Sequence, residues 1–377
     1  MVRQAACQDG TMSISNHRRR SLRSFGVVAL LAVAVGACGG SEDAASTLVP
    51  ETEALTEVAS SAPAPEETVV DTEAPVAAID RVMAPEASAV DDLLALVRPV
   101  IIAHAGGDFD WPHSTMYAFT EAALNGTDVL EMDVMLSADD VLVVQHDNAV
   151  DRLTADSGLV SSFTLAELQA MDNAYWFSGG VWSDKELADD AYIYRGIRTG
   201  DRPAPEGYTA DDFRIVTFEE VARAFPNHVL DVEIKIPEAA TGEIQIDRAL
   251  AATDELVRLI KELGREESIV VVSFNDDVLA AFRNSIADVA TSPGQTSLVN
   301  WYLAGAALDP RDVVLQAPPV YEGVEVLTAE TFDRAHAENR AVWVWMSDSS
   351  QENTDFYNEL VLRGADGLLI SSPTAAP

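Results

Sequence analysis

Cysteine is scarce in this chain of 377 residues. Cys7 precedes the first apolar run and Cys38 closes it, so the rest of the chain holds no pair that could form a disulfide. With 48% hydrophobic residues, a chain of this length can bury a large core without disulfides. The sequence therefore excludes a disulfide-stapled fold and makes thiol redox chemistry an unsuitable explanation of function.

Basic residues are also few. The chain has 24 Lys and Arg against 62 Asp and Glu, a formal net charge of -38. Nucleic-acid binding depends on a basic surface, so we expect no nucleic-acid partner. An acidic surface also repels phosphodiesters and phospholipid head groups. A site for such a substrate must bring local positive charge from a metal, Lys or Arg.

The N-terminal apolar run, Phe25 to Ala37, is too short to span a bilayer and fits a signal sequence. Arg18, Arg19, Arg20 and Arg23 precede it, and Val35-Gly36-Ala37-Cys38 resembles a bacterial lipobox. Residues 1–37 are therefore predicted to be a lipoprotein signal peptide, with a lipid on Cys38. The chain would be exported and anchored to the outer face of the cytoplasmic membrane. A buried or membrane-anchored helix is the alternative, and the export route stays open.

Residues 38–93 are rich in Ala, Pro, Glu, Thr and Ser, without a period that could bury a face. This composition predicts a disordered, self-repelling acidic linker. The folded domain is then expected over residues 94–377, close in size to the ~250 residues of a (β/α)8 barrel.

Strand-like and helix-like segments alternate along that domain. The expected strands are 99–105, 128–136, 141–145, 229–236, 268–274, 312–317, 341–346 and 367–371. The expected helices are 114–124, 245–263, 277–285, 328–338 and 353–363. The alternation predicts an α/β fold with a parallel sheet, and we favour a (β/α)8 barrel. A doubly wound open sheet is the alternative, although no Gly-rich phosphate loop follows the first strand.

Two of these strands carry charge on one face. In a strand, residues two apart share a face, so Glu131 lies beside Asp133, and Asp231, Glu233 and Lys235 lie together. Inside a barrel, unpaired carboxylates are costly, and a hard divalent cation would offset that cost. Oxygen ligands suit Mg²⁺ or Ca²⁺. The alternative is that both strands have one water-facing side.

Two histidines end apolar runs. His104 follows Val100 and Ile102 on one strand face, and His146 follows Leu142 and Val144 on another. The C-terminal ends of barrel strands carry active sites, so we interpret this pair as a general acid and base. His228 and His336 lack such surroundings and are predicted to be surface residues.

In order, these residues resemble the glycerophosphodiester phosphodiesterases, members of the phospholipase-C-like phosphodiesterase barrels. The resemblance covers the whole folded domain. Its motifs are His-x-Gly (His104, Gly106), Pro-x-x-Thr (Pro112, Thr115), Glu-x-Asp (Glu131, Asp133), His-Asp with a following Arg (His146, Asp147, Arg152), Glu-x-Lys (Glu233, Lys235), and the matches at Ser273-Phe274, Trp345 and 364–367.

The resemblance implies a TIM barrel that hydrolyses a phosphodiester to an alcohol and a phosphomonoester such as glycerol 3-phosphate. It implies that the substrate's neighbouring hydroxyl attacks phosphorus and that water opens the resulting cyclic phosphate. The implied site residues are Glu131, Asp133 and Glu233 for the metal, His104 and His146 for acid/base catalysis, and Lys235, Arg152 and Trp345 for phosphate and substrate.

The segment at about 154–214 resembles the family's insertion between strands 2 and 3. Its aromatic residues are expected either to cover the site or to form a small core of their own; they are Tyr175, Trp176, Phe177, Trp182, Tyr192 and Tyr194.

Three positions depart from the family pattern. Ala105 replaces an Arg expected at the phosphate, for which Arg152, Arg195 and Arg198 are possible substitutes. His113 replaces a Glu, whose role Asp108, Asp110 or the His113 imidazole could take. Ser372 replaces an acid before Pro373. We therefore keep a second hypothesis, a catalytically altered barrel lipoprotein that binds a phosphodiester or related envelope ligand without turnover. No feature indicates an oligomeric state.

Overall fold

The computed structural model describes residues 76–180 and 183–377. The predicted signal peptide, Cys38 and the linker up to residue 75 lie outside these ranges and stay predictions. Within them, no helix combines the length and the apolar content needed to cross a membrane.

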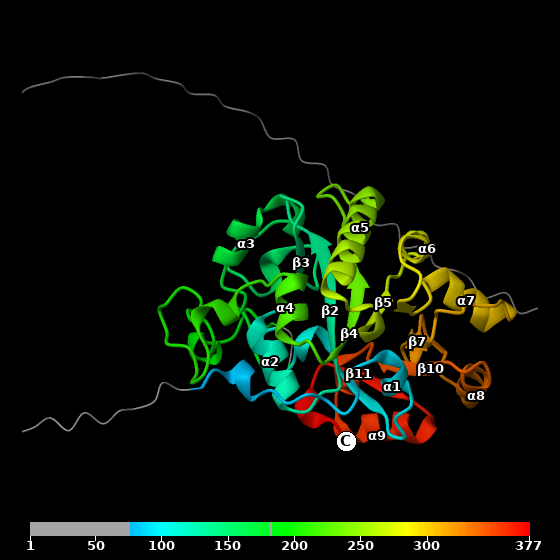
Figure 1. Ribbon diagram of the computed structural model, residues 1–377. Coiled ribbons are helices and arrows are strands. Elements are labelled where there is room, and N and C mark those ends of the chain that lie inside the picture. The colour runs from blue at the N-terminus through cyan, green and yellow to red at the C-terminus, as the bar shows by residue number, and fades with distance from the viewer. Residues whose placement is uncertain (1–75, 181–182) are drawn as a thin grey trace, which may run out of the picture. The chain divides into compact units, whose positions relative to one another are not determined.

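Eight parallel strands form a nearly closed barrel (Figure 1). Around the barrel they are β6 (Ala290–Thr291), β5 (Ile269–Val272), β4 (Val229–Ile234), β2 (Val129–Leu136), β1 (Val100–Ala103), β11 (Gly367–Ile370), β10 (Ala341–Trp345) and β7 (Val314–Ala317). A parallel bridge between Thr291 and Asp312, just before β7, joins the two edges. The predicted barrel is confirmed. The open-sheet alternative is excluded, because the two edge strands of an open sheet would not be joined by such a bridge.

One predicted strand is not part of the barrel wall. The run at 141–145 forms β3 (Leu142–Val144), which pairs antiparallel with the end of β2. The missing barrel strand is β6, which sequence reasoning did not find because it has only two residues. A strand that short leaves no alternating pattern to detect.

Helices surround the strands, as the alternation predicts. The expected helices are α2 (Met116–Leu124), α5 (Ile246–Leu263), α6 (Asp276–Ser285), α8 (Ala329–Ala337) and α9 (Thr354–Arg363). Helices that the sequence did not reveal are α1 (Val90–Leu94), α3 (Leu165–Ala170), α4 (Phe218–Ala224) and α7 (Gln295–Ala304). A small hairpin, β8 (Val320–Tyr321) and β9 (Val324–Glu325), follows β7.

Short 3-10 helices occupy many of the connections. They are η1 (Ala78–Arg81), η2 (His104–Gly106), η3 (Val150–Arg152), η4 (Val160–Ser162), η5 (Asp189–Ala191), η6 (Ala210–Phe213), η7 (Glu266–Ser268), η8 (Ser349–Gln351) and η9 (Pro373–Ala375).

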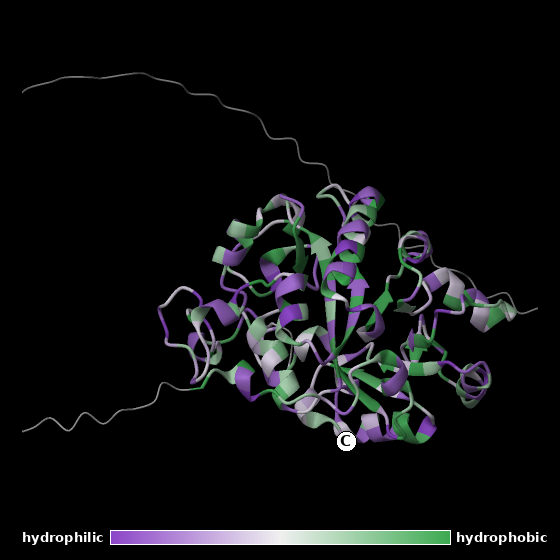
Figure 2. Cartoon of the chain, in the orientation of Figure 1, coloured by the Kyte–Doolittle hydropathy of each residue, from purple (hydrophilic) through white to green (hydrophobic). Residues whose placement is uncertain are grey.

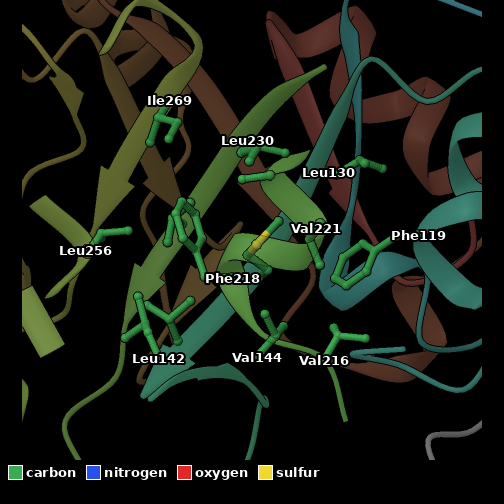
Figure 3. Packing of buried hydrophobic residues seen from close by; sticks show 14 of the residues in the cluster. Phe119, Leu130, Leu142, Val144, Val216, Phe218, Val221, Leu230, Leu256 and Ile269 are labelled. Atoms are coloured by element: carbon green, nitrogen blue, oxygen red, sulfur yellow. The ribbon is translucent and has the colours of Figure 1, made fainter. Parts of the chain in front are cut away.

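The main core lies between the barrel wall and the outer helices. Outward-facing Leu130 and Leu230 pack with Phe119 of α2, Phe218 of α4 and Leu256 of α5 (Figure 3). Along α5, hydrophobic and hydrophilic residues alternate in stripes (Figure 2), as expected for a helix with one buried face. This packing leaves the opposite strand faces to fill the barrel interior.

The lower half of the barrel interior is apolar. Val129, Val229, Val270 and Trp343 meet there, and Leu93 of α1 packs against them. Gly367 makes room for the Trp343 ring, since a Cβ at Gly367 would lie 2.5 Å from the indole. Only the upper half is left for polar chemistry.

The sequence predicts that the folded domain begins at residue 94, but in the structure the packed part of the chain begins earlier. Residues 76–93 include η1 and most of α1, and Ala87, Val90 and Leu93 are buried. Three apolar residues are enough to anchor a segment when a barrel end offers them an apolar surface. These three residues form too short an apolar pattern to predict a helix within the acidic stretch around them.

His228 is buried, which corrects its prediction as a surface residue. It packs edge-on to Phe225, and Arg265 donates a 2.6 Å hydrogen bond to its carbonyl. Burial, together with the charge of Arg265, lowers the pKa of His228 to about 4, so the ring is neutral. His336 is partly exposed and its Nε2 lies 2.8 Å from Asp366.

The aromatic residues of the insertion form a satellite core. Arg195 stacks on the rings of Tyr175, Trp176 and Tyr192, and Tyr194 packs on Tyr117. None of the described insertion aromatics lines the cavity presented below, so the covering role is not supported for them; Trp182 lies outside the described residues.

Candidate active site

The two histidines singled out in the sequence line one cavity, but only His104 lies at the end of a barrel strand. The prediction that His146 also ends a barrel strand is wrong, because β3 runs antiparallel to β2 outside the barrel wall. His104 directly follows β1, and His146 follows β3 by two residues. Their ring centroids are 5.1 Å apart with the planes at 76°, and both rings line one cavity. Two imidazoles from separate strands are thus close enough to act on one substrate group.

A carboxylate lies beside each imidazole. Nδ1 of His104 is 3.1 Å from Oδ1 of Asp108, and Nδ1 of His146 is 3.0 Å from Oδ1 of Asp147. Such contacts favour a proton on Nδ1 and fix the orientation of the ring. Sequence reasoning had named Asp108 only as a substitute for the missing Glu, and the His104 contact shows where that carboxylate acts.

His104 carries a proton in this environment. Burial alone would lower its pKa, but the negative charges of Asp108, Glu131 and Asp133 outweigh burial and raise the pKa to about 10. Burial would likewise raise the pKa of Asp108, yet His104 holds it below its ordinary value. The two groups form an imidazolium–carboxylate pair at neutral pH.

Parallel pairing places the acidic residues of β2 and β4 in two rungs. Glu131 is aligned with Asp231, and Asp133 with Glu233. The exposed fractions of Glu131, Asp133 and Asp231 are 4%, 1% and 0%. The alternative of a water-facing strand surface is therefore excluded, and the predicted inward orientation is correct.

Lys235 lies between the acids of the upper rung. Its Nζ is 2.7 Å from Oδ1 of Asp133 and 3.0 Å from Oε2 of Glu233. Burial would lower the pKa of Lys235, but the two carboxylates raise it above its ordinary value. For Glu131, burial together with the charge of Asp133 raises the pKa well above the usual range, although the nearby charge of His104 opposes the shift.

The chemistry of these carboxylates fits a hard divalent cation. Glu131, Asp133 and Glu233 offer oxygen ligands from adjacent strands, and neither oxygen of Asp133 has a well-aligned hydrogen-bond partner. Across residues 76–180 and 183–377, however, no three His, Cys, Asp or Glu side chains converge on one point. The Lys235 ammonium stands between Asp133 and Glu233, so a cation bound by all three carboxylates would have to displace it.

Asp231 received no role from the sequence, and the structure places it in the lower rung. Nε2 of Gln316, from β7, donates to both of its oxygens at 2.9 and 2.8 Å. Burial raises the pKa of Asp231 to about 7. A partly protonated Asp231 limits the negative charge gathered beneath Glu131.

The turn after β1 explains two of the motifs. Ala105 adopts φ 47°, and its N–H donates to Oε2 of Glu131 at 2.5 Å. A Cβ at Gly106 would lie 3.1 Å from that of Ala118 in α2, so glycine permits this close approach. Thr115 caps α2 by accepting a hydrogen bond from the Ala118 N–H at 3.1 Å. The glycine and the threonine thus hold His104 at the strand end.

The arginines proposed to replace the missing one lie elsewhere. Arg152 pairs with Asp147, next to His146; Arg195 is enclosed by insertion aromatics; and Arg198 pairs with Asp211. None of the three lines the cavity, and among the described lining residues Lys235 is the only lysine or arginine.

The other departures also have structural counterparts. His113 is buried with its ring centroid 6.2 Å from that of His146, and burial lowers its pKa to about 3. Asp110 does not reach the site; it accepts a 2.8 Å hydrogen bond from Ser372 Oγ. Glu352, which sequence reasoning missed, lines the cavity and accepts a 3.0 Å hydrogen bond from the Ser371 N–H. It restores a carboxylate beside the position that lost one.

The cavity has a volume of about 390 Å³, within the usual range for small-molecule sites. Its two ends differ. We define the charged half as His104, Glu131, His146, Glu233 and Lys235, and the apolar half as Phe274, Pro293, Leu298, Val299, Tyr302, Tyr321, Val326, Trp345 and Met346. Trp345, predicted to bind substrate, therefore lies in the wall of the cavity.

Comparisons with known proteins identify the family of the chain. Residues 104–374 match the model of the glycerophosphoryl diester phosphodiesterase family. The chain is 31% identical over 179 residues to glycerophosphodiester phosphodiesterase of Caldanaerobacter subterraneus subsp. tengcongensis, covering 48% of this chain and 59% of that protein. It is 25% identical over 194 residues to the Bacillus subtilis enzyme of that name, covering 51% and 58%. The chain thus spans less than two thirds of these relatives.

Solved structures share the fold. A phosphodiesterase of Oleispira antarctica, in complex with the product sn-glycerol-3-phosphate, superposes with a TM-score of 0.54 at 19% identity and covers 73% of this chain and 94% of its own. A glycerophosphoryl diester phosphodiesterase from Parabacteroides distasonis gives 0.54 at 18% identity, covering 77% and 90%. At this identity the likeness supports the barrel fold alone.

Proposed function

The chain belongs to the glycerophosphoryl diester phosphodiesterase family, and from that premise we propose that it hydrolyses glycerophosphodiesters to an alcohol and glycerol 3-phosphate. The observation that carries the proposal is the pair His104 and His146, 5.1 Å apart between ring centroids, in one cavity with Lys235. The Oleispira antarctica structure, which holds sn-glycerol-3-phosphate, makes this product the first to look for.

We assign the two proton-transfer roles from the partners of the rings. His104, kept protonated beside Asp108, gives a proton to the leaving alcohol oxygen. His146, oriented by Asp147, takes the proton from the attacking hydroxyl. That hydroxyl belongs to the substrate, so the first product is a cyclic phosphate. Water then opens the ring, with the two histidines exchanging roles.

We also propose that Glu131, Asp133 and Glu233 hold Mg²⁺ or Ca²⁺. The cation would place positive charge against the non-bridging phosphate oxygens. Lys235, released from Asp133 and Glu233, would then be available to the phosphate, which suits its position as the cavity's lysine.

The test is release of alcohol and glycerol 3-phosphate from a panel of glycerophosphodiesters, with Mg²⁺, Ca²⁺ or EDTA, by the protein and its His104→Ala variant. Turnover that needs the cation and disappears in the variant supports the proposal. A folded protein that binds phosphodiesters but releases no product would instead favour the binding-lipoprotein hypothesis.

Cation binding is measured separately by calorimetric titration. Glu131→Gln removes one proposed ligand charge and should abolish or strongly weaken binding of Mg²⁺ and Ca²⁺. Glu219→Gln, on the exposed side of α4, is the matched control. Equal cation affinity in both variants would disprove the proposed ligand set.

We propose further that the protein is exported and lipid-anchored through Cys38. In a bacterial host, the wild type should label with a radioactive fatty acid and sediment with membranes. Cys38→Ser should lose the label and enter the soluble fraction. Unchanged sedimentation without label would mean that another feature holds the protein at the membrane.

A further inference from the structure

The apolar half of the cavity comes from elements that contribute nothing to the charged half. Leu298, Val299 and Tyr302 project from α7, Tyr321 from the hairpin, and Met346 follows β10. In Figure 1, α7 lies on the β5–β7 side of the barrel, away from α2 and α3. The two halves nevertheless line one continuous space, so a ligand with its phosphate at His104 extends toward α7.

Several polar side-chain atoms in and beside this half are directed to other protein groups. The Tyr302 hydroxyl donates to the Glu325 carbonyl at 3.3 Å, the Thr331 hydroxyl donates to the Val326 carbonyl at 2.7 Å, and Gln295 Nε2 donates to the Tyr321 hydroxyl. A polar ligand group here would lose its water and find few partners, which is unfavourable. An apolar chain makes no hydrogen bonds to water, so it would give up none on entering this half.

The wall is anchored rather than loose. Trp301, on the buried side of α7, donates from Nε1 to Oε2 of Glu338 at 2.8 Å, and the Arg334 guanidinium lies 4.1 Å from its ring centroid. The contact between Gln295 and Tyr321 ties α7 to the hairpin. Leu298 and Val299 are therefore held in place before any ligand arrives.

Apolar side chains continue from the wall to the outer surface. Val299 is exposed although it lines the cavity, and Leu303, one turn further along α7, is 75% exposed. Val324 of the hairpin is 55% exposed, and Phe274 and Val320 are also exposed. Neighbouring exposed apolar residues of this kind mark binding surfaces. Leu303, Val320 and Val324 lie on α7 and the hairpin, two of the elements that also supply the wall.

We propose that the substrate is an amphiphilic phosphodiester, a monoacyl glycerophosphodiester, whose acyl chain lies along the apolar half. This inference rests on the proposed function and names its substrate class. Water cleaves the P–O bond to the head-group alcohol: phosphorus keeps the water oxygen, the alcohol takes a proton, and acylglycerol phosphate is the second product. One acyl chain leaves a glycerol hydroxyl free for the proposed attack, whereas two chains leave none.

The first experiment compares substrates that share one head group. Hexanoyl, octanoyl and decanoyl glycerophosphodiesters, used as monomers below micelle formation, are measured against the deacylated compound and a diacyl phospholipid. We expect kcat/KM to rise with chain length, by up to roughly fourfold for each methylene that is buried. The diacyl compound should not turn over.

The second experiment changes the wall. Val299→Asp places a charge on an exposed cavity residue and should lower kcat/KM for the decanoyl substrate at least tenfold more than it lowers kcat/KM for the deacylated substrate. Val299→Ile keeps the surface apolar and should retain the chain-length dependence. Leu362→Asp, at an 89% exposed position of α9 outside the cavity, is the matched charge control and should change neither substrate.

The outcomes separate the two proposals. Equal rates for acylated and deacylated substrates, or an equal loss for both in Val299→Asp, overturn the acyl-chain inference and leave the phosphodiesterase intact. If no phosphodiester turns over, the proposed function fails. The acyl-chain inference is then tested by measuring the affinity of the same acyl series by calorimetry. Affinity that grows with chain length and falls in Val299→Asp supports the apolar site; affinity independent of chain length overturns it.

Discussion

The charged and apolar halves of the cavity use their polar atoms in opposite ways. In the charged half, burial gathers groups whose charges depend on one another, as in Asp108 with His104 and Lys235 with Asp133. In the apolar half, the hydroxyls of Tyr302 and Thr331 are directed to backbone carbonyls. The first arrangement keeps charge available for chemistry, and the second removes polarity from the ligand's surroundings. Variants in each half and in the lower barrel would show whether this division holds.

The largest effect is expected at the histidine pair. His146→Ala should lower kcat by about 10² to 10⁴, the usual contribution of a general acid or base. Because both rings serve one proton-transfer sequence, the double variant His104→Ala/His146→Ala should be little worse than either single variant. His336→Ala, at a partly exposed position, is the control. Losses that multiply in the double variant would show that the two rings act independently.

A smaller loss is expected behind the pair. Asp108→Asn removes the charge beside His104 and should lower kcat at least about tenfold, because the ring is less well oriented and holds its proton less firmly. The pKa of His104, followed by NMR titration, should fall from about 10. An unchanged pKa would show that Glu131 and Asp133 suffice to hold the proton.

The same variant has a stability signature. The pKa of His104 is raised from 6.5 to about 10 in the folded protein, so the protonated ring stabilises the fold fully below pH 6.5. This contribution disappears as the pH rises through about 10. Asp108→Asn should therefore lower the free energy of unfolding most at neutral and mildly acidic pH. The difference from the wild type should be smaller above pH 10, where His104 is neutral, and at strongly acidic pH, where Asp108 is itself protonated, as chemical denaturation would report.

In the apolar half, Trp345→Ala should act mainly on substrate binding. The side chain lines the cavity wall, so its loss should raise KM by about tenfold, the effect of a lost aromatic contact of about 1.4 kcal/mol, with little change in kcat. Steady-state kinetics on the best substrate of the panel separates the two constants. A fall in kcat alone would place Trp345 functionally with the charged half.

The least effect on the cavity is expected from the lower barrel. Leu93→Ala empties space against Val129 and Val270 and should lower the free energy of unfolding by about 2 to 5 kcal/mol. The KM of the remaining folded protein should not change, because Leu93 is separated from the site by the lower interior layer. Thermal denaturation and steady-state kinetics measure the two parts of this prediction.

Strand alternation predicted which side chains enter the barrel, because a period of two leaves no other choice once one face is apolar. Glu131, Asp133 and Glu233 therefore could be read from the chain, as could the strand-end positions of His104 and His146. The two-residue β6 could not, since its pairing is fixed by its neighbours. The burial of His228 was hidden for a similar reason: its environment comes from Phe225 and Arg265, the latter far along the chain.

By itself the sequence determined the barrel and the family, from the alternating segments and the ordered motifs of the whole folded domain, and the charged half, whose residues all lie within 104–235. Only the tertiary structure decided the partners: Lys235 between Asp133 and Glu233, Arg152 on Asp147, and Glu352 beside Ser371. The apolar half was also decided there. Its residues come from separate loops and α7, and apolar side chains in a sequence look the same whether they fill a core or line a cavity. Only the packing of distant segments distinguishes the two.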